Sequence, residues 1–521
     1  MSMPGARRSL FLTLAFLPAI AGVNCAQRSQ GPPLAEPSSS REPALFAAVE
    51  EFRLDNGMLF LLLPRHDVPT IAARTLVKVG NVDNPAGDSG LAHMFEHMAF
   101  KGTDVMGARD VAAEAALLDS IGAIGDRLRL AVKAADADSA QIQALHARIT
   151  DLEGQAAGFV DPMAFFKLYE RFTYDYNAST GQDFTIYETL LPANALEAWM
   201  LIESERLQHP VFREFYAELD VVKDERRMRR DDSPEGMAWE LMQGLAFGEH
   251  PYRCPTIGYE EDLNALSPNL ARDFYKTYYV PGNMVAALVG DFDPARARGL
   301  IRAYFGDIAP RPSPPLIPDL SLDGMAAQRD LHRQGEERQL LMAFPGLEPG
   351  SSKMAAAELL ADVLARDRTS RLIHRLDIEM GVARDVSVYA DGGFKRARGL
   401  FVIVVDLMPQ HGNEEAEALV WEELRRLQEA PVAEAKLAEI RAAERKSFVF
   451  GLQENAAIAQ RLVLSQAGRG DWRHIYRRVA AYEAVTPQDI RNLARELFVP
   501  ERATIVYLEP EPAQTSPGGQ P

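Results

Sequence analysis

The stretch of the chain with the clearest chemical potential runs from Gly90 to Phe100 and contains two histidines and a glutamate. Its apolar run, with Asp88 or Ser89 as cap, predicts a helix that places His93 and His97 on one face. Two imidazoles on one face can share a cation, and Glu96 would then lie beside that cation without having to ligate it. This arrangement is typical of zinc hydrolases, in which such a glutamate accepts a proton from the attacking water.

The rest of the chain restricts how a metal could be held. Two cysteines, Cys25 and Cys254, cannot build a cysteine-ligated metal site or a disulfide framework, so a metal would depend on histidine and carboxylate. The other eight histidines show no paired spacing and are expected to be structural or solvated: His66, His146, His209, His250, His332, His374, His411 and His474. A buried helix whose histidines are merely structural is the alternative to a metal site.

A catalytic zinc ion needs a third protein ligand. The helix predicted over Phe215 to Arg229 carries Glu218 and Glu225, which are seven residues apart and therefore share a face. One of them could ligate the metal while the other holds the outer nitrogen of a histidine. Spacing alone does not choose between Glu218, Asp224 and Glu225, and each could instead be a surface acid paired with a nearby arginine.

Composition excludes several classes of protein. Of the 521 residues, 47% are hydrophobic and 25% are charged, which is the ordinary mix of a globular protein and not that of a disordered chain or a fibrous repeat. Lysine and arginine number 56 against 74 aspartates and glutamates, a formal net charge of −18. A balance this acidic argues against general binding of nucleic acid.

Both ends of the chain have compositions that are not typical of a folded core. Residues 1–26 combine two early arginines with a short apolar stretch and are predicted to be a signal peptide, so we expect an exported, periplasmic protein. A lipid anchor on Cys25 is less favoured because an asparagine precedes it. Residues 27–44 and 509–521 are predicted to be flexible, and no later segment is apolar enough to span a membrane.

An internal repeat indicates two related domains. Ser267-Pro268 recurs as Thr486-Pro487, 219 residues later, and in both places a helix start leads through a Val-Pro pair into a strand. We therefore predict an α+β fold with related domains at 45–310 and 325–508, each a mostly antiparallel sheet covered by helices. Residues 108–156, rich in Ala, Leu and charge, predict a helical hairpin inserted into the first domain. A plain helical element of the core is the alternative.

The chain resembles the pitrilysin–insulysin–mitochondrial processing peptidase family of inverted-motif zinc proteases over nearly all of its mature length. The matching stretches are Gly90 to Thr103, Asn177 to Thr180, Val221 to Glu225, His250-Pro251-Tyr252 with Thr256-Ile257-Gly258, and Tyr279 to Asn283 leading to Gly290-Asp291. The resemblance implies one Zn²⁺ per chain, with Glu225 as third ligand and Glu218 as the supporting acid. It also places Asn177 and Ala178 on an edge strand that pairs with an extended substrate.

One departure from the family bears on partners. In the family, the second half carries an Arg and, seven residues later, a Tyr, and these two residues hold the substrate. At the corresponding positions this chain has Asp377 and Arg384. We therefore expect a zinc endopeptidase subunit that cleaves extended or unfolded peptides together with a related subunit supplying the Arg/Tyr pair. A non-catalytic binding or assembly subunit and a homodimer with another clamp are the alternatives.

Overall fold

The computed structural model describes residues 45–161, 163–317, 321–322, 325–391 and 395–512. The predicted signal peptide, the N-terminal linker and most of the predicted C-terminal tail lie outside these residues. Within them, no helix has both the length and the apolar character needed to cross a membrane.

The first half of the chain forms a six-stranded sheet in the order β1-β2-β6-β3-β5-β4. All neighbouring strands are antiparallel except β2 and β6, which run parallel. β1 and β2 form a β-hairpin, in which Gly57 takes the positive φ (96°) that the tight turn requires. The strands are β1 (Glu50–Arg53), β2 (Leu59–Pro64), β3 (Thr70–Val77), β4 (Asp175–Thr180), β5 (Thr185–Pro192) and β6 (Met284–Gly290).

The second half forms a five-stranded sheet in the order β7-β11-β8-β10-β9, with β7 and β11 as its parallel pair. This order repeats β2-β6-β3-β5-β4 of the first sheet strand for strand, so the predicted α+β fold of two related halves is confirmed. The strands are β7 (Gln328–Arg333), β8 (Gln339–Pro345), β9 (Ala383–Ala390), β10 (Leu400–Leu407) and β11 (Thr504–Glu509).

The sequence repeat corresponds to the helix before the central strand of each sheet. α9 (Pro268–Tyr278) precedes β6, and α17 (Pro487–Leu497) precedes β11. The Ser267 side chain accepts a hydrogen bond from the backbone of Leu270, and the Thr486 side chain accepts one from Asp489. Each cap, followed by proline, fixes a helix start from local sequence alone.

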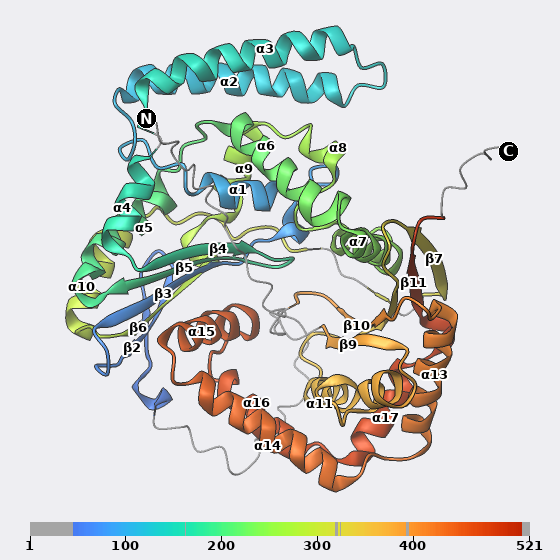
Figure 1. The fold of residues 1–521 in the computed structure, drawn as a ribbon. Helices are drawn as coiled ribbons and strands as arrows, with labels where there is room; N and C mark the ends of the chain where they lie inside the picture. The colour runs from blue at the N-terminus through green and yellow to red at the C-terminus, as the bar shows by residue number, and fades with distance from the viewer. Residues whose placement is uncertain (1–44, 162, 318–320, 323–324, 392–394, 513–521) are drawn as a thin grey trace, which may run out of the picture.

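The two halves exchange a helix. α7 (Pro234–Phe247), from the first half, packs on the second sheet through Ala238, Met242 and Ala246. α15 (Asn455–Arg469), from the second half, packs on the first sheet through Ile458 and Leu462. Each sheet is therefore completed by the other half, and Figure 1 shows α15 beneath the first sheet and α7 beside β11. The division at 45–310 and 325–508 stays a prediction.

The predicted inserted hairpin consists of α2 (Val111–Val132) and α3 (Ser139–Ala156), which lie antiparallel on the outer side of the first half (Figure 1). α2 packs on α9, and buried side chains of both helices, such as Ile121 and Ile149, join the core of the first half. The hairpin is therefore anchored to the layer of helices that holds the candidate site.

The remaining helices cover the sheets. In the first half they are α1 (Leu91–Met98), α4 (Ala164–Phe172), α5 (Leu196–Gln208), α6 (Phe215–Arg226), α8 (Glu260–Leu263) and α10 (Pro294–Phe305). In the second half they are α11 (Met354–Ala365), α12 (Arg371–Ile373), α13 (Asn413–Glu429), α14 (Glu434–Gly451) and α16 (His474–Ala484). α6 ends earlier than predicted, because Arg227–Asp231 continue it as a π-helical turn.

Candidate metal centre

The helix that carries the histidines begins differently from the prediction. Gly90, in the left-handed conformation (φ 85°), caps α1, and neither Asp88 nor Ser89 does so. Asp88 is instead buried and ion-paired with Arg129 and Lys133 of α2. These two cations take the carboxylate away from the helix start, so Asp88 ties the hairpin to the beginning of α1.

Three side chains converge at the centre of the first half. Glu225 Oε2 on α6 lies 3.4 Å from His97 Nε2 and 3.8 Å from His93 Nε2, both on α1. Zinc bonds of about 2.1 Å at tetrahedral angles separate ligand atoms by about 3.4 Å. The spacing of these three atoms and their mixed nitrogen and oxygen chemistry therefore fit one zinc ion.

The protonation states of the histidines differ. Burial, reinforced by the positive charge of His97, lowers the pKa of His93 to about 3, so its ring is neutral and has a lone pair for a metal. Burial opposes the charge on His97, but hydrogen bonds to Glu218 and Glu225 outweigh it and raise the pKa of His97 to about 10. The carboxylates of Glu218 and Glu225 thus favour a positive charge at the position of His97.

Glu218 supports His97 from the outside. Its Oε1 lies 2.8 Å from His97 Nδ1, and its Oε2 lies 2.7 Å from Lys101 Nζ. Burial raises the pKa of this carboxyl, but the bonds from His97 and Lys101 outweigh burial and lower it to about 2. An ionised carboxylate on the outer nitrogen fixes the ring orientation and leaves Nε2 for the metal.

The surroundings of the three candidate acids of α6 show which of them faces the histidines. The other oxygen of Glu225, Oε1, lies 2.7 Å from Arg229 Nη1, which holds the carboxylate with Oε2 toward the histidines. Asp224 has a side chain that is 67% exposed and pairs with Arg227, so it points away from the cluster. The structure thus brings His93, His97 and Glu225 together and puts Glu218 behind them.

Glu96 is buried next to this cluster and faces β4. Its Oε2 accepts a hydrogen bond from Thr180 Oγ1 at 2.5 Å. Burial raises the pKa of Glu96, although His97 and Thr180 oppose the shift, and a raised pKa suits a group that must accept and return a proton. No role for Thr180 was predicted, because Thr180 and Glu96 are 84 residues apart and their spacing in the sequence does not indicate a contact.

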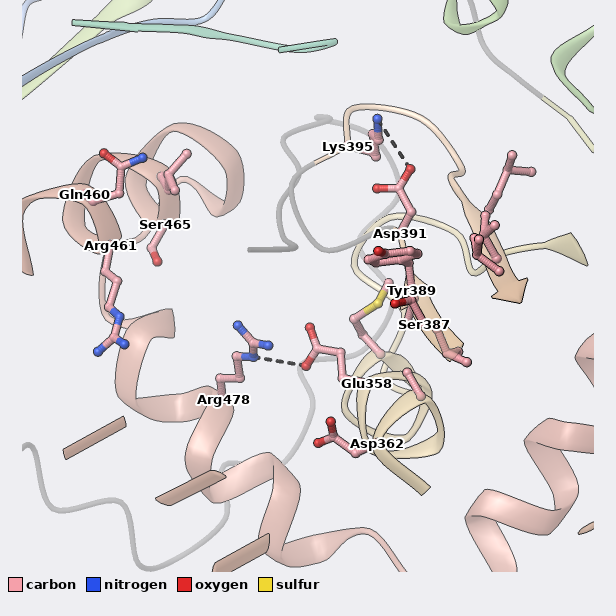
Figure 2. A pocket seen from close by; sticks show the side chains of 18 of the residues that line it. Glu358, Asp362, Ser387, Tyr389, Asp391, Lys395, Gln460, Arg461, Ser465 and Arg478 are labelled. Atoms are coloured by element: carbon pink, nitrogen blue, oxygen red, sulfur yellow. Dashed lines mark hydrogen bonds and ion pairs between the residues drawn. The ribbon is translucent and has the colours of Figure 1, made fainter. Parts of the chain in front are cut away.

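The site opens on a cavity of about 1980 Å³ between the two halves, to which His93, Glu96, Ser179 and Thr180 contribute. Further lining comes from the second half, where Figure 2 shows polar side chains of α11, β9, α15 and α16 around the space. Among them, Arg478 pairs with Glu358 and Lys395 pairs with Asp391. The cavity is therefore large and polar enough to hold an extended peptide.

The two residues predicted to contact substrate lie on β4, the strand that ends the first sheet next to β5. Asn177 is half-buried and Ala178 is buried, and the cavity wall is formed by the next two residues, Ser179 and Thr180. The strand ends at Thr180, whose side chain contacts Glu96. The backbone of β4 thus leads toward the candidate centre.

Replacing Glu225 by glutamine is expected to weaken zinc binding more than replacing Glu218 by glutamine does. A ligand of the ion contributes directly, whereas loss of a supporting carboxylate typically weakens affinity by about 10–100-fold. Chelator titration of zinc from both variants measures the difference. Equal zinc affinities would leave the third ligand unassigned, and selective loss in the Glu218 variant would reverse the two roles.

Comparison with known proteins finds similarity to peptidases along most of the chain. Residues 265–444 match the family model described as the Peptidase M16 inactive domain. The zinc protease PqqE of Helicobacter pylori is 22% identical over 472 residues, which cover 88% of this chain and 93% of the relative. The resemblance predicted from the motifs is confirmed as a similarity: the second half matches an M16 peptidase domain, and a relative that aligns over most of the chain is named a zinc protease.

Solved structures show the same fold. A protease from Helicobacter pylori superposes with a TM-score of 0.73 at 20% identity, over 89% of this chain and 99% of that chain. The periplasmic protease PqqL from Escherichia coli gives 0.65 at 16% identity, and pitrilysin gives 0.63 at 16%. The chain covers 47% of each of these two longer proteins.

Proposed function

We propose that this protein is a zinc-dependent endopeptidase subunit that hydrolyses extended or unfolded peptides. The observation that carries the proposal is the convergence of His93, His97 and Glu225 beside the buried carboxyl of Glu96, on the wall of a large cavity. The similarity to this family, with relatives named zinc proteases, supports the same assignment.

Each residue has a distinct part in the proposed reaction. His93, His97 and Glu225 would hold the zinc ion, and Glu218 would orient His97. A zinc ion there supplies Lewis acidity, which polarises a carbonyl and acidifies water. Glu96 accepts the proton that the attacking water loses and returns it to the leaving amine, and Thr180 holds the carboxyl of Glu96 in place through its hydroxyl group.

The substrate class follows from the surroundings of the site. Among the residues that the structure describes, no strand pairs with the outer edge of β4, so its backbone can hydrogen-bond an extended peptide. Ser179 and Thr180 lie where such a peptide would enter the cavity. Folded domains present few segments in this conformation. An unstructured peptide is therefore the substrate that this geometry favours.

A non-catalytic subunit of the same fold is the second candidate, and the description of the matching family model as an inactive domain favours it. That match covers residues 265–444, whereas His93, Glu96, His97 and Glu225 lie before it. The match therefore concerns the second half of the chain and leaves the candidate site untouched. A site that only stored or bound zinc would also have no use for Glu96.

Location and partners are further parts of the proposal. The signal-like residues 1–26 and the similarity to a periplasmic protease support an exported protein. Asp377 and Arg384, in place of an Arg/Tyr pair, support a heterodimer with a related subunit.

Removal of zinc tests the proposed function. Hydrolysis of a long unstructured peptide, with the partner subunit present, is expected to disappear in a chelator and to return on adding one equivalent of Zn²⁺ per chain. Metal analysis and product mass spectrometry measure content and cleavage side by side. Hydrolysis that persists in a zinc-free chain contradicts the proposal, and zinc binding without any hydrolysis favours the non-catalytic candidate.

A further inference from the structure

A second group of metal-ligating side chains lies outside the candidate centre. Asp104, Glu205 and His209 each place one ligand atom within 4.8 Å of the other two. Glu205 and His209 are one turn apart at the end of α5, with His209 Nδ1 3.2 Å from Glu205 Oε2. Asp104 comes from the loop between α1 and α2. We propose that these three residues form a second divalent-cation site, separate from the first.

The charge of the cluster is not balanced by the protein. Among the described residues, neither Asp104 nor Glu205 forms an ion pair with a lysine or an arginine, unlike Asp88 and Glu225. Asp104 Oδ1 is shielded from solvent and has no hydrogen-bond donor there. A buried carboxylate oxygen without a partner is costly, and two neighbouring carboxylates repel each other. A bound cation would remove both penalties.

The backbone holds the cluster in place independently of any metal. Thr103 bridges to Pro210, which joins the loop to the chain just after His209. The buried Arg213 donates to the backbone oxygens of Thr103 and Met106, on both sides of Asp104, and pairs with Glu114 of α2. Asp104 is thus positioned against the end of α5 before a cation arrives, which lowers the entropy lost on binding.

The donor set indicates the class of ion. Imidazole favours zinc and related transition metals, whereas magnesium and calcium are bound by oxygen ligands. One imidazole with two carboxylates leaves room for water and fits Zn²⁺. His209, 47% exposed, provides access from solvent. The ion would join the loop that follows the His93 helix to the end of α5, so its role would be structural.

The test counts zinc and compares matched variants. Equilibrium dialysis of the full chain against Zn²⁺ is expected to give two equivalents per chain. Asp104→Asn, Glu205→Gln and His209→Asn should each lose one equivalent or bind it at least about 100-fold more weakly, and should lose a zinc-dependent rise in Tm. Their melting in chelator should match that of the unchanged chain, which separates lost binding from misfolding.

His411→Asn is the control. His411 and Glu415 form another pair four residues apart, with 2.8 Å between His411 Nδ1 and Glu415 Oε2, but no third ligand joins them among the described residues. This variant should keep both equivalents. Unchanged stoichiometry in all three cluster variants would overturn the proposal. Loss in His209→Asn alone would also overturn it, because it would show binding to one exposed histidine.

The second site does not depend on the proposed peptidase function. The cluster variants leave His93, His97 and Glu225 intact, so the first equivalent of zinc and any hydrolysis should persist in them. If the unchanged chain binds a single equivalent and Asp104→Asn abolishes it, the second site stands and the first fails. If Asp104→Asn leaves that equivalent in place, the second site fails.

Discussion

Replacing Glu96 by glutamine is expected to lower peptide hydrolysis by about 10²–10⁴-fold, the usual contribution of a general base, while zinc content stays unchanged. Glutamine keeps the shape of the side chain but cannot accept the proton of the attacking water. His93, His97 and Glu225 are untouched, so the metal ligands remain. Metal analysis beside a peptide-cleavage assay measures both quantities on one preparation.

A matched control for this variant is Thr180→Val, which removes the hydrogen bond to Glu96 and nearly keeps the side-chain volume. Because the carboxyl itself remains, the loss of activity should be much smaller than in Glu96→Gln. Turnover near normal in Glu96→Gln would remove this residue from the mechanism. Loss of zinc from the same variant would instead show that Glu96 belongs to the ligand set.

The sequence predicted those parts of the fold that depend on local signals. Ser267-Pro268 and Thr486-Pro487 are cap-and-proline pairs, and a cap acts within one turn of its own helix, so the repeat they mark reappears as α9 and α17. The exchange of α7 and α15 could not be predicted in this way. Both helices bury apolar side chains, such as Met242 and Leu462, and nothing in the local sequence assigns these side chains to one sheet or the other.

The candidate site shows the same division between local and distant contacts. His93 and His97 share a helix, so their spacing alone places both on one face. Glu218 and Glu225 also share a face, so their spacing does not tell the metal ligand from the supporting acid. Only their distances to the histidine nitrogens separate the two roles. The contacts of Asp88 with α2 and of Thr180 with Glu96 join residues distant in sequence, for which a single chain gives no signal.

We expect the substrate-binding part of the site to be incomplete in this chain alone. Asp377 lies in the π-helical turn before β9, where its Oδ2 is 3.7 Å from Arg368 Nη1. Arg384, at the start of β9, is 55% exposed and lies 3.8 Å from Glu337. Neither side chain lines the cavity. An ionised aspartate cannot donate to a peptide carbonyl, and arginine lacks the flat apolar ring of tyrosine.

The purified chain, loaded with zinc but without a partner, is therefore expected to hydrolyse a long unstructured peptide at least about 100-fold more slowly than it does with a related subunit that carries the Arg/Tyr pair. Contacts remote from the scissile bond position it for attack, and a small misplacement costs about that much in rate. Assays before and after adding the subunit, with the mass of each species in solution, measure the effect.

Installing the missing pair provides the matching variant. Asp377→Arg combined with Arg384→Tyr should let a second copy of this chain act as the partner, so that activity appears without the other subunit and rises with dimer formation. Arg384→Lys, which keeps the charge and adds no ring, should give no such gain. Full activity of the unchanged chain, at the mass of one chain or of two identical chains, would contradict the expectation, because the residues already present would then hold the peptide.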